Sequence, residues 1–197
     1  MPLTLRRTTD ASAEPILWAE AQLYLRLDSA DEQTTVEAFI SAARQVVEEQ
    51  LGRQLITATW ELCLDNFPSD SSPIELPRPP LASISSITYL DENAVSQTLA
   101  AADYQADLKS NPGRLLPAAD EIWPATQYDQ MNTVTITYTS GYGAAGSSVP
   151  RPIRQAILLL VSHWFENREA VLVGTISAEL PMAVKMLLAP FRVYTQR

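Results

Sequence analysis

The chain has 197 residues, of which 46% are hydrophobic, so it is long enough to bury the core of one domain or of two small ones. It carries 23 acidic and 14 basic residues, and its net charge of -9 disfavours a surface that wraps nucleic-acid phosphates through counterion release. We therefore expect a folded, acidic protein that does not bind DNA or RNA tightly.

The N-terminus, the apolar stretches and the cysteine content argue against secretion and membrane insertion. Arg6 and Arg7 are not followed by an apolar run, so neither a Sec nor a twin-arginine signal is expected. The longest apolar stretch, residues 156–161, is too short to span a bilayer. Cys63 is the only cysteine, which excludes an internal disulfide and a multi-cysteine metal site. These features predict a protein made in a reducing cytoplasm, with no membrane partner.

A long amphipathic helix is predicted in the N-terminal part. Ser29 and Glu32 have capping-box spacing at its start, and Gly52 suits the left-handed residue that ends a helix. Arg44 and Glu48 are one turn apart on its other face, where we expect them to pair weakly on the solvent side. The apolar residues that recur at helical intervals are Val36, Phe39, Ile40, Ala43, Val47 and Leu51.

The middle of the chain changes to a period of two, which predicts strands. Residues 56–64 alternate between apolar and mainly polar side chains, and residues 84–90, 95–99 and 133–139 are further strand candidates. Residues 91–94 are typical of a turn. Most of the 14 prolines lie in or beside this region, so its strands must be short. We expect a small antiparallel sheet.

Helical patterns return near the C-terminus. Residues 153–165 are apolar around most of the helix circumference, which indicates a buried helix. A last helix over residues 182–188 is bounded by Pro181 and Pro190. A short helix near residues 16–25 is expected to precede the long N-terminal one.

These elements predict the α+β class, with N- and C-terminal helices that form one core around an inserted small antiparallel β-rich region. The predicted parts are residues 15–56 and 150–190 for the helical core, residues 57–140 for the insertion and residues 191–197 for a C-terminal tail.

No residue pattern indicates catalysis or a bound cofactor or metal. His163 is the only histidine, and neither a serine nor Cys63 has a motif context that would make it a nucleophile. The glycine-rich segment 141–146 has neither the lysine of a phosphate-binding loop nor the spacing of a dinucleotide loop. We interpret His163 as structural and the glycine segment as a connector, and we expect the protein not to be an enzyme.

The order of several segments resembles one protein family. These segments are "LGRQLITATWEL", "LPRPPLASISSITYLDENA", the pair Asp103 and Tyr104, "GRLLP" leading to Trp123, and "VTITYTSGYG" followed by "VPRPIRQAILLLVSHWFENRE". Over residues 17–194 the chain resembles the head-to-tail connector (adaptor) proteins of long-tailed bacteriophages, whose relatives occur in gene transfer agents.

The resemblance implies a virion protein that is made in the bacterial cytoplasm and located at the head-tail junction. Usually twelve copies form a homo-oligomeric ring under the portal protein, extend the DNA channel and join the head to a stopper or tail-completion protein. DNA passes through such a ring without specific binding, which agrees with the acidic surplus. The alternative is a neck or tail-terminator structural protein of the same particle.

Two kinds of contact segment are predicted. The tail contains two aromatics and two arginines, and the resemblance assigns Phe191, Arg192 and Tyr194 to portal docking. The alternative is that the two aromatic rings fold back onto the subunit's own helices. Two loops, residues 141–149 and 173–180, are expected either to be ordinary surface loops or to become ordered on assembly. The residues predicted to make these assembly contacts are Gly141, Tyr142, Gly143, Gly174 and Thr175.

Overall fold

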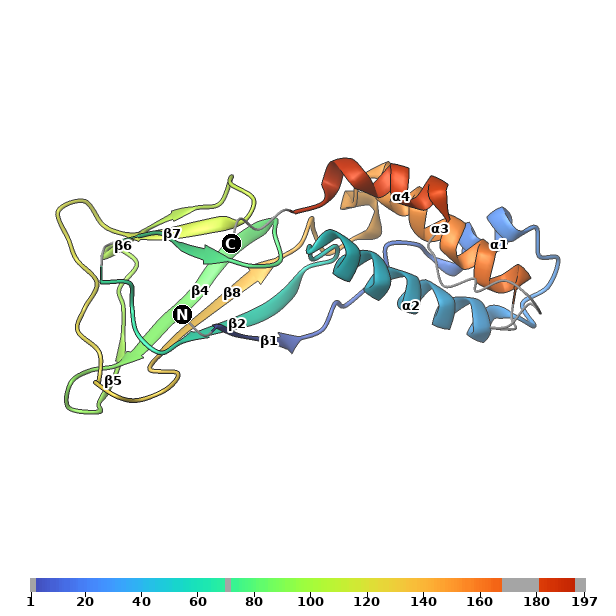
Figure 1. Cartoon of the computed structure of the whole chain (residues 1–197). Helices are drawn as coiled ribbons and strands as arrows, with labels where there is room; N and C mark the ends of the chain where they lie inside the picture. Colours follow the sequence, from blue (N-terminus) through green and yellow to red (C-terminus); the bar gives the residue numbers. More distant parts are fainter. Residues whose placement is uncertain (1–2, 70–71, 168–180, 194–197) are drawn as a thin grey trace, which may run out of the picture. The chain divides into compact units, whose positions relative to one another are not determined.

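The computed structural model describes residues 3–69, 72–167 and 181–193, and the chain divides into two units (Figure 1). The sheet unit comprises Met1–Ser12, Thr57–Tyr142 and Thr195–Arg197, and the helical unit comprises Ala13–Ile56 and Gly143–Tyr194. Each unit is thus assembled from segments that are distant in the sequence.

The sheet unit contains two antiparallel sheets. The larger has the order β1 (Leu3–Thr9), β2 (Ala58–Leu64), β8 (Val134–Ser140), β4 (Leu81–Leu90) and β5 (Ser96–Thr98). The smaller has the order β3 (Ile74–Leu76), β7 (Gly113–Pro117) and β6 (Tyr104–Asp107).

Alternation along the central strands builds the core of this unit. Every second residue of β2 and of β8 is buried, and Leu62 lies opposite Ile136. Ile87 of β4 pairs with the same Ile136 from the other side. The apolar cluster also takes in Leu76 of β3 and Leu115 of β7, so it is shared by both sheets. Burial of the apolar faces of both sheets is the main stabilising term.

The predicted strands are confirmed as β2, β4, β5 and β8, but the expectation of a small inserted β region is wrong. The unit has two sheets, and its edge strand β1 comes from the N-terminus rather than from the middle of the chain. That strand was missed because its polar residues outnumber its two leucines. The three-stranded sheet was missed because its strands have only three to five residues each.

The helical unit contains α1 (Trp18–Leu25), α2 (Gln33–Leu51), α3 (Arg151–Glu166) and α4 (Met182–Leu188), with short 3-10 turns at Gly146–Ser148 and Ala189–Phe191. Helix α3 packs against both α2 and α4, and the rings of Phe39 and Trp164 meet edge to face at 6.3 Å. None of the helices in the described part of the chain has the length and apolar character needed to cross a membrane.

The start of α2 differs from the prediction, whereas its end agrees with it. The helix begins at Gln33, and the hydroxyl of Ser29 donates to Asp31 at 2.9 Å instead of closing a capping box with Glu32. Gly52 ends the helix with a φ of 65°, a conformation that glycine adopts without steric cost.

Candidate assembly surfaces and functional site

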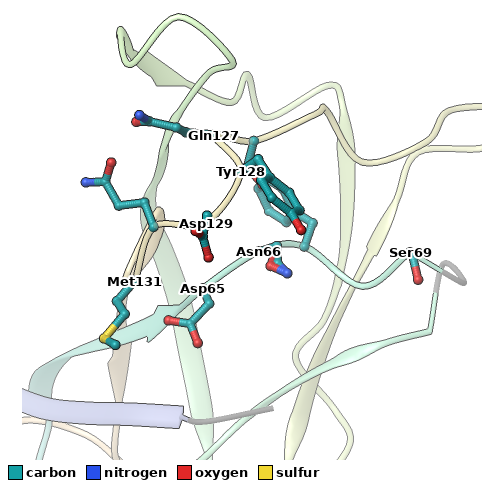
Figure 2. A pocket seen from close by; sticks show the side chains of 10 residues that line it. Asp65, Asn66, Ser69, Gln127, Tyr128, Asp129 and Met131 are labelled. Atoms are coloured by element: carbon teal, nitrogen blue, oxygen red, sulfur yellow. The ribbon is translucent and has the colours of Figure 1, made fainter.

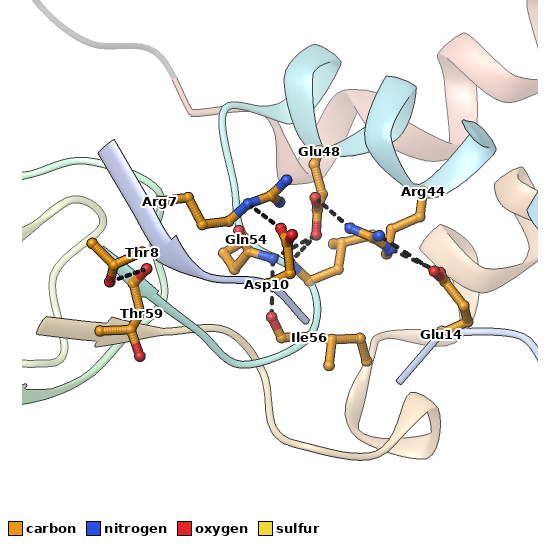
Figure 3. Close-up of polar contacts among 10 residues, drawn as sticks. Arg7, Thr8, Asp10, Glu14, Arg44, Glu48, Gln54, Ile56 and Thr59 are labelled. Atoms are coloured by element: carbon orange, nitrogen blue, oxygen red, sulfur yellow. Dashed lines mark hydrogen bonds and ion pairs between the residues drawn. The ribbon is translucent and has the colours of Figure 1, made fainter. Parts of the chain in front are cut away.

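A buried charged cluster lies beside α2 (Figure 3). The Arg44 guanidinium donates from Nε and Nη2 to the two carboxylate oxygens of Glu14, at 2.8 and 3.3 Å, and from Nη1 to Glu48 at 3.0 Å. Arg44 is only 6% exposed and Glu48 only 4%. The prediction of a solvent-side pair is therefore wrong, because Glu14 and the segment after α2 cover this face of the helix.

The other oxygen of Glu48 connects the cluster to the segment that follows α2. It accepts hydrogen bonds from the Gln54 side-chain amide at 2.7 Å and from the Leu55 backbone N–H at 3.1 Å. Burial lowers the pKa of Arg44, but Glu14 and Glu48 outweigh that effect and raise it, so the guanidinium stays charged. The cluster thus fixes both the segment that precedes α1 and the segment that leaves α2.

The predicted assembly loop at residues 141–149 is held by backbone contacts. Gly141 and Gly143 have φ values of 134° and 153°, which favour glycine, and the Gly141 N–H donates to the Pro80 carbonyl at 2.9 Å. A methyl group at Gly146 would lie 2.5 Å from the Pro15 carbonyl oxygen, so the chain approaches Pro15 closely there. Tyr142 is half-buried.

The other predicted loop residues, Gly174 and Thr175, lie outside the described residues. The assembly role of both loops therefore stays a prediction.

The first residues of the C-terminal tail contact the end of α2. The carbonyl of Phe191 accepts a hydrogen bond from Arg53 Nε, and the Val193 N–H donates to the Leu51 carbonyl at 2.9 Å. The second bond satisfies a carbonyl that the end of a helix leaves without an internal partner. Of the predicted docking residues, Phe191 is half-buried, Arg192 is exposed, and Tyr194 lies outside the described residues.

An exposed methionine pair on α4 was not predicted as a contact surface. Met182 and Met186 are 71% and 70% exposed and lie one turn apart, whereas Val184 and Leu188 are buried on the other face. Methionine side chains adapt their shape to a partner, and exposed pairs of this kind are common on binding surfaces. The helical period of residues 182–188 was a signal for this surface, because it separates the two methionines from the buried residues.

His163 and Cys63, whose side chains could be reactive, have amide and hydroxyl neighbours. His163 is half-buried on α3, with Nδ1 3.4 Å from the side-chain amide of Asn167. Cys63 is half-buried on β2, with Sγ 3.9 Å from the Thr135 hydroxyl. Within residues 3–69, 72–167 and 181–193, no group of three or more His, Cys, Asp or Glu side chains could hold a metal ion.

Comparisons with known proteins agree on one family. A family model described as "Head completion protein" matches residues 16–178. Three solved structures are similar over 98% of this chain and 97% of theirs. They are the neck of an empty gene transfer agent (GTA) particle computed with C6 symmetry (TM-score 0.80, 22% identity), the virion of a native gene transfer agent particle (0.78, 22%) and the neck of a native GTA particle computed with C12 symmetry (0.73, 23%). No curated protein matches the chain significantly in sequence.

Proposed function

The chain belongs to the head completion protein family, and we propose that it acts as the head-to-tail adaptor of a tailed phage or gene transfer agent particle. Twelve copies would form a ring under the portal, extend the DNA channel and present a platform to a stopper or tail-completion protein. Membership of the family makes the chain a structural head completion protein rather than an enzyme, as the sequence predicted. The observation that carries the adaptor proposal is the similarity, over nearly the whole chain, to neck structures computed with C6 and C12 symmetry.

The physical properties of the chain support a ring. A closed ring uses two different surfaces on every subunit and needs no catalytic pocket. The net charge of -9 suits a channel through which DNA slides, because repulsion between carboxylates and phosphates prevents adhesion. The ring model therefore assigns the acidic surplus a role in DNA passage.

The ring is tested by its stoichiometry and by its place in the particle. We expect light scattering to show a monomer for the purified protein, because a single heterologous contact is weak before a ring closes. Symmetry-resolved imaging of particles should show twelve copies directly under the portal. A stable two-fold dimer in solution would contradict the ring, and copies at the far end of the neck would favour a tail-terminator role.

Portal docking by Phe191, Arg192 and Tyr194 is the second part of the proposal. The contacts of Phe191 and Val193 with the end of α2 fix where the tail leaves the helical unit, so two truncations are informative. A chain that ends at Val193 keeps these contacts and should fold with an unchanged melting temperature, yet fail to join DNA-filled heads. A chain that ends at Pro190 also loses the contacts of Phe191 and Val193 with α2, and its melting temperature shows how much those contacts stabilise the helical unit. Normal tailed particles from the chain that ends at Val193 would rule out docking through Tyr194 and the residues after it.

The two loops are proposed to become ordered against a neighbouring subunit or the stopper. Hydrogen exchange of the free protein and of assembled particles should show increased protection of Tyr142, Gly143 and the segment around Gly174 and Thr175. Unchanged protection in both loops would assign them to ordinary surface loops.

A further inference from the structure

A hollow of about 520 Å³ lies in the sheet unit, between the segment that follows β2 and the segment that leads into β8 (Figure 2). Asp65 and Asn66 come from the first segment, and Tyr128, Asp129 and Met131 come from the second. Figure 2 shows Asp65 and Asn66 on the first segment and Tyr128, Asp129 and Met131 on the second. This volume lies within the range of pockets that bind ligands in proteins.

The walls of this pocket are fixed by the core of the sheet unit. The ring of Trp123 stacks on Phe67 at 4.8 Å with an interplanar angle of 6°, which anchors the start of the second segment. The Gln127 N–H donates to the Leu90 carbonyl at 3.0 Å, and the Asn132 N–H donates to the Asp65 carboxylate at 3.0 Å. Between these anchors the segment exposes 93% of Tyr128 and 80% of Met131. Large apolar side chains held in the solvent by a fixed backbone indicate a contact surface.

The charge of the pocket indicates what enters it. Among the described residues, neither Asp65 nor Asp129 has a cationic partner. The described residues provide no third carboxylate, histidine or cysteine that would complete a metal site there. Two carboxylates beside an aromatic ring and a thioether therefore match an ammonium group on an aliphatic stem, with an apolar neighbour.

The sheet unit itself carries an ammonium group beside an apolar residue, on the turn between β6 and β7. Arg6, Arg7 and Arg114 are paired with Glu61, Asp10 and Asp107, and Arg78 lies over the ring of Trp60 at 5.4 Å. In the described part of the unit, Lys109 is the cation whose side chain has neither a carboxylate nor an aromatic partner. Its neighbour Leu108 is 43% exposed.

The turn that carries Leu108 and Lys109 is held in shape by Asp107. The Asp107 carboxylate accepts the backbone N–H groups of Lys109 at 3.0 Å and of Ser110 at 3.1 Å, together with the Ser110 hydroxyl. Two other turns also expose a large apolar residue, Val95 and Ile122. Their nearby charged residues are acidic, so these turns do not offer a cation to a pocket lined by carboxylates. Lys109 is not among the residues that line the pocket of its own chain, and Figure 1 shows the turn between β6 and β7 away from the segment that leads into β8.

We propose that the Leu108–Lys109 turn of one copy enters the Asp65–Asp129 pocket of the neighbouring copy, with Lys109 between the two carboxylates and Leu108 against Met131 and Tyr128. This inference rests on the proposed ring. A projecting turn and a pocket on different parts of one unit make a heterologous contact, which repeats from copy to copy around a closed ring. Opposite charges then set the direction in which each copy faces its neighbour.

Cysteine crosslinking in assembled particles tests the contact. A chain with Cys63→Ser, Lys109→Cys and Tyr128→Cys should give a ladder of disulfide-linked oligomers from particles and no ladder from the purified monomer. A matched chain with Val95→Cys in place of Tyr128→Cys should give no ladder, because Val95 is exposed on a turn outside the pocket. Particles that contain the normal ring but give no ladder from the first chain would overturn the contact and leave the adaptor function intact.

Charge reversal separates this contact from docking of another protein. Lys109→Glu and Asp129→Lys should each lower incorporation into particles by about tenfold, equivalent to about 1.4 kcal/mol, while circular dichroism stays unchanged. The chain with both changes should regain most of the loss, because the pair is restored with reversed signs. If Asp129→Lys blocks assembly, Lys109→Glu does not, and no ladder forms, the pocket holds a different protein and the inference is wrong.

Discussion

The helical unit and the sheet unit bury different kinds of side chain. Beside α2 the helical unit buries the charged pair of Arg44 and Glu48, and Glu14, Gln54 and the Leu55 backbone N–H form hydrogen bonds with this pair. In the described part of the sheet unit no charged residue is buried, and the indole N–H groups of Trp60 and Trp123 have no acceptor there. Alternation of apolar residues therefore defines the central strands β2 and β8 of the sheet unit, whereas a polar network fixes how the segments of the helical unit meet.

Removal of the Glu48 carboxylate, at the centre of the polar network, should give the largest loss of stability. Glu48→Leu leaves the Arg44 guanidinium, the Gln54 amide and the Leu55 N–H without their shared acceptor, and we expect it to lower the free energy of unfolding by about 3 to 5 kcal/mol. Urea unfolding followed by circular dichroism measures the loss.

The control for this change lies on the same helix. Glu37→Gln alters an exposed carboxylate that accepts a hydrogen bond from the Gln33 side chain at 2.8 Å, so it should lower the free energy of unfolding by less than about 0.5 kcal/mol. Equal losses from Glu48→Leu and Glu37→Gln would show that the buried network stabilises the helical unit no more than an exposed pair on the same helix does.

A cavity in the sheet core should lower the free energy of unfolding slightly less than Glu48→Leu does. The loss should appear in the sheet unit and not in the helical unit. Ile136 is fully buried in the central strand β8, so Ile136→Ala should cost about 2 to 4 kcal/mol. Each unit has two tryptophans, Trp60 and Trp123 in the sheet unit and Trp18 and Trp164 in the helical unit. Phenylalanine replacement of either pair leaves a fluorescence signal from one unit alone. The urea midpoint of unfolding reported by Trp60 and Trp123 should fall in Ile136→Ala. An equal fall in the midpoint reported by Trp18 and Trp164 would show that the two cores unfold as one.

A single methyl group should destabilise the loop before α3. Gly146→Ala places a carbon 2.5 Å from the backbone oxygen of Pro15, which cannot rotate away, and we expect a loss of about 1 to 3 kcal/mol. Ala144→Ser in the same loop is exposed and serves as the control. A loss of melting temperature limited to Gly146→Ala would show that this loop is packed rather than merely surface-exposed.

The smallest effect is expected at the turn that carries Lys109. The Ser110 hydroxyl, the Arg114 guanidinium and two backbone N–H groups hold the pKa of Asp107 well below its ordinary value of 3.8. Since the folded pKa is depressed, the turn keeps its stabilisation above pH 3.8 and loses it as the pH falls towards the folded value. The amide resonance of Ser110 should therefore stay constant from pH 7 to 4 and shift only at lower pH. A titration centred at pH 4 or above would contradict this, and Asp107→Asn should abolish the shift.

The sequence predicted those parts of the fold that local patterns define. Period-two burial predicted β2 and β8, Gly52 marked the end of α2, and two prolines bounded α4. The Arg44 cluster was not predictable, because its acidic partner Glu14 lies 30 residues away. The pocket was missed for the same reason, since its two walls lie about 60 residues apart and each has the composition of an ordinary polar loop.

The interleaved order of the two units has a consequence for synthesis of the chain on the ribosome. Strand β8 lies between β2 and β4, and α3 packs against both α2 and α4, so each core requires a segment from the last third of the chain. A nascent chain that stops before Val134 lacks the central strand of one core and the central helix of the other. Neither unit can therefore fold stably before the other during synthesis. Incomplete translation products then carry no folded surface that could take a place in a particle.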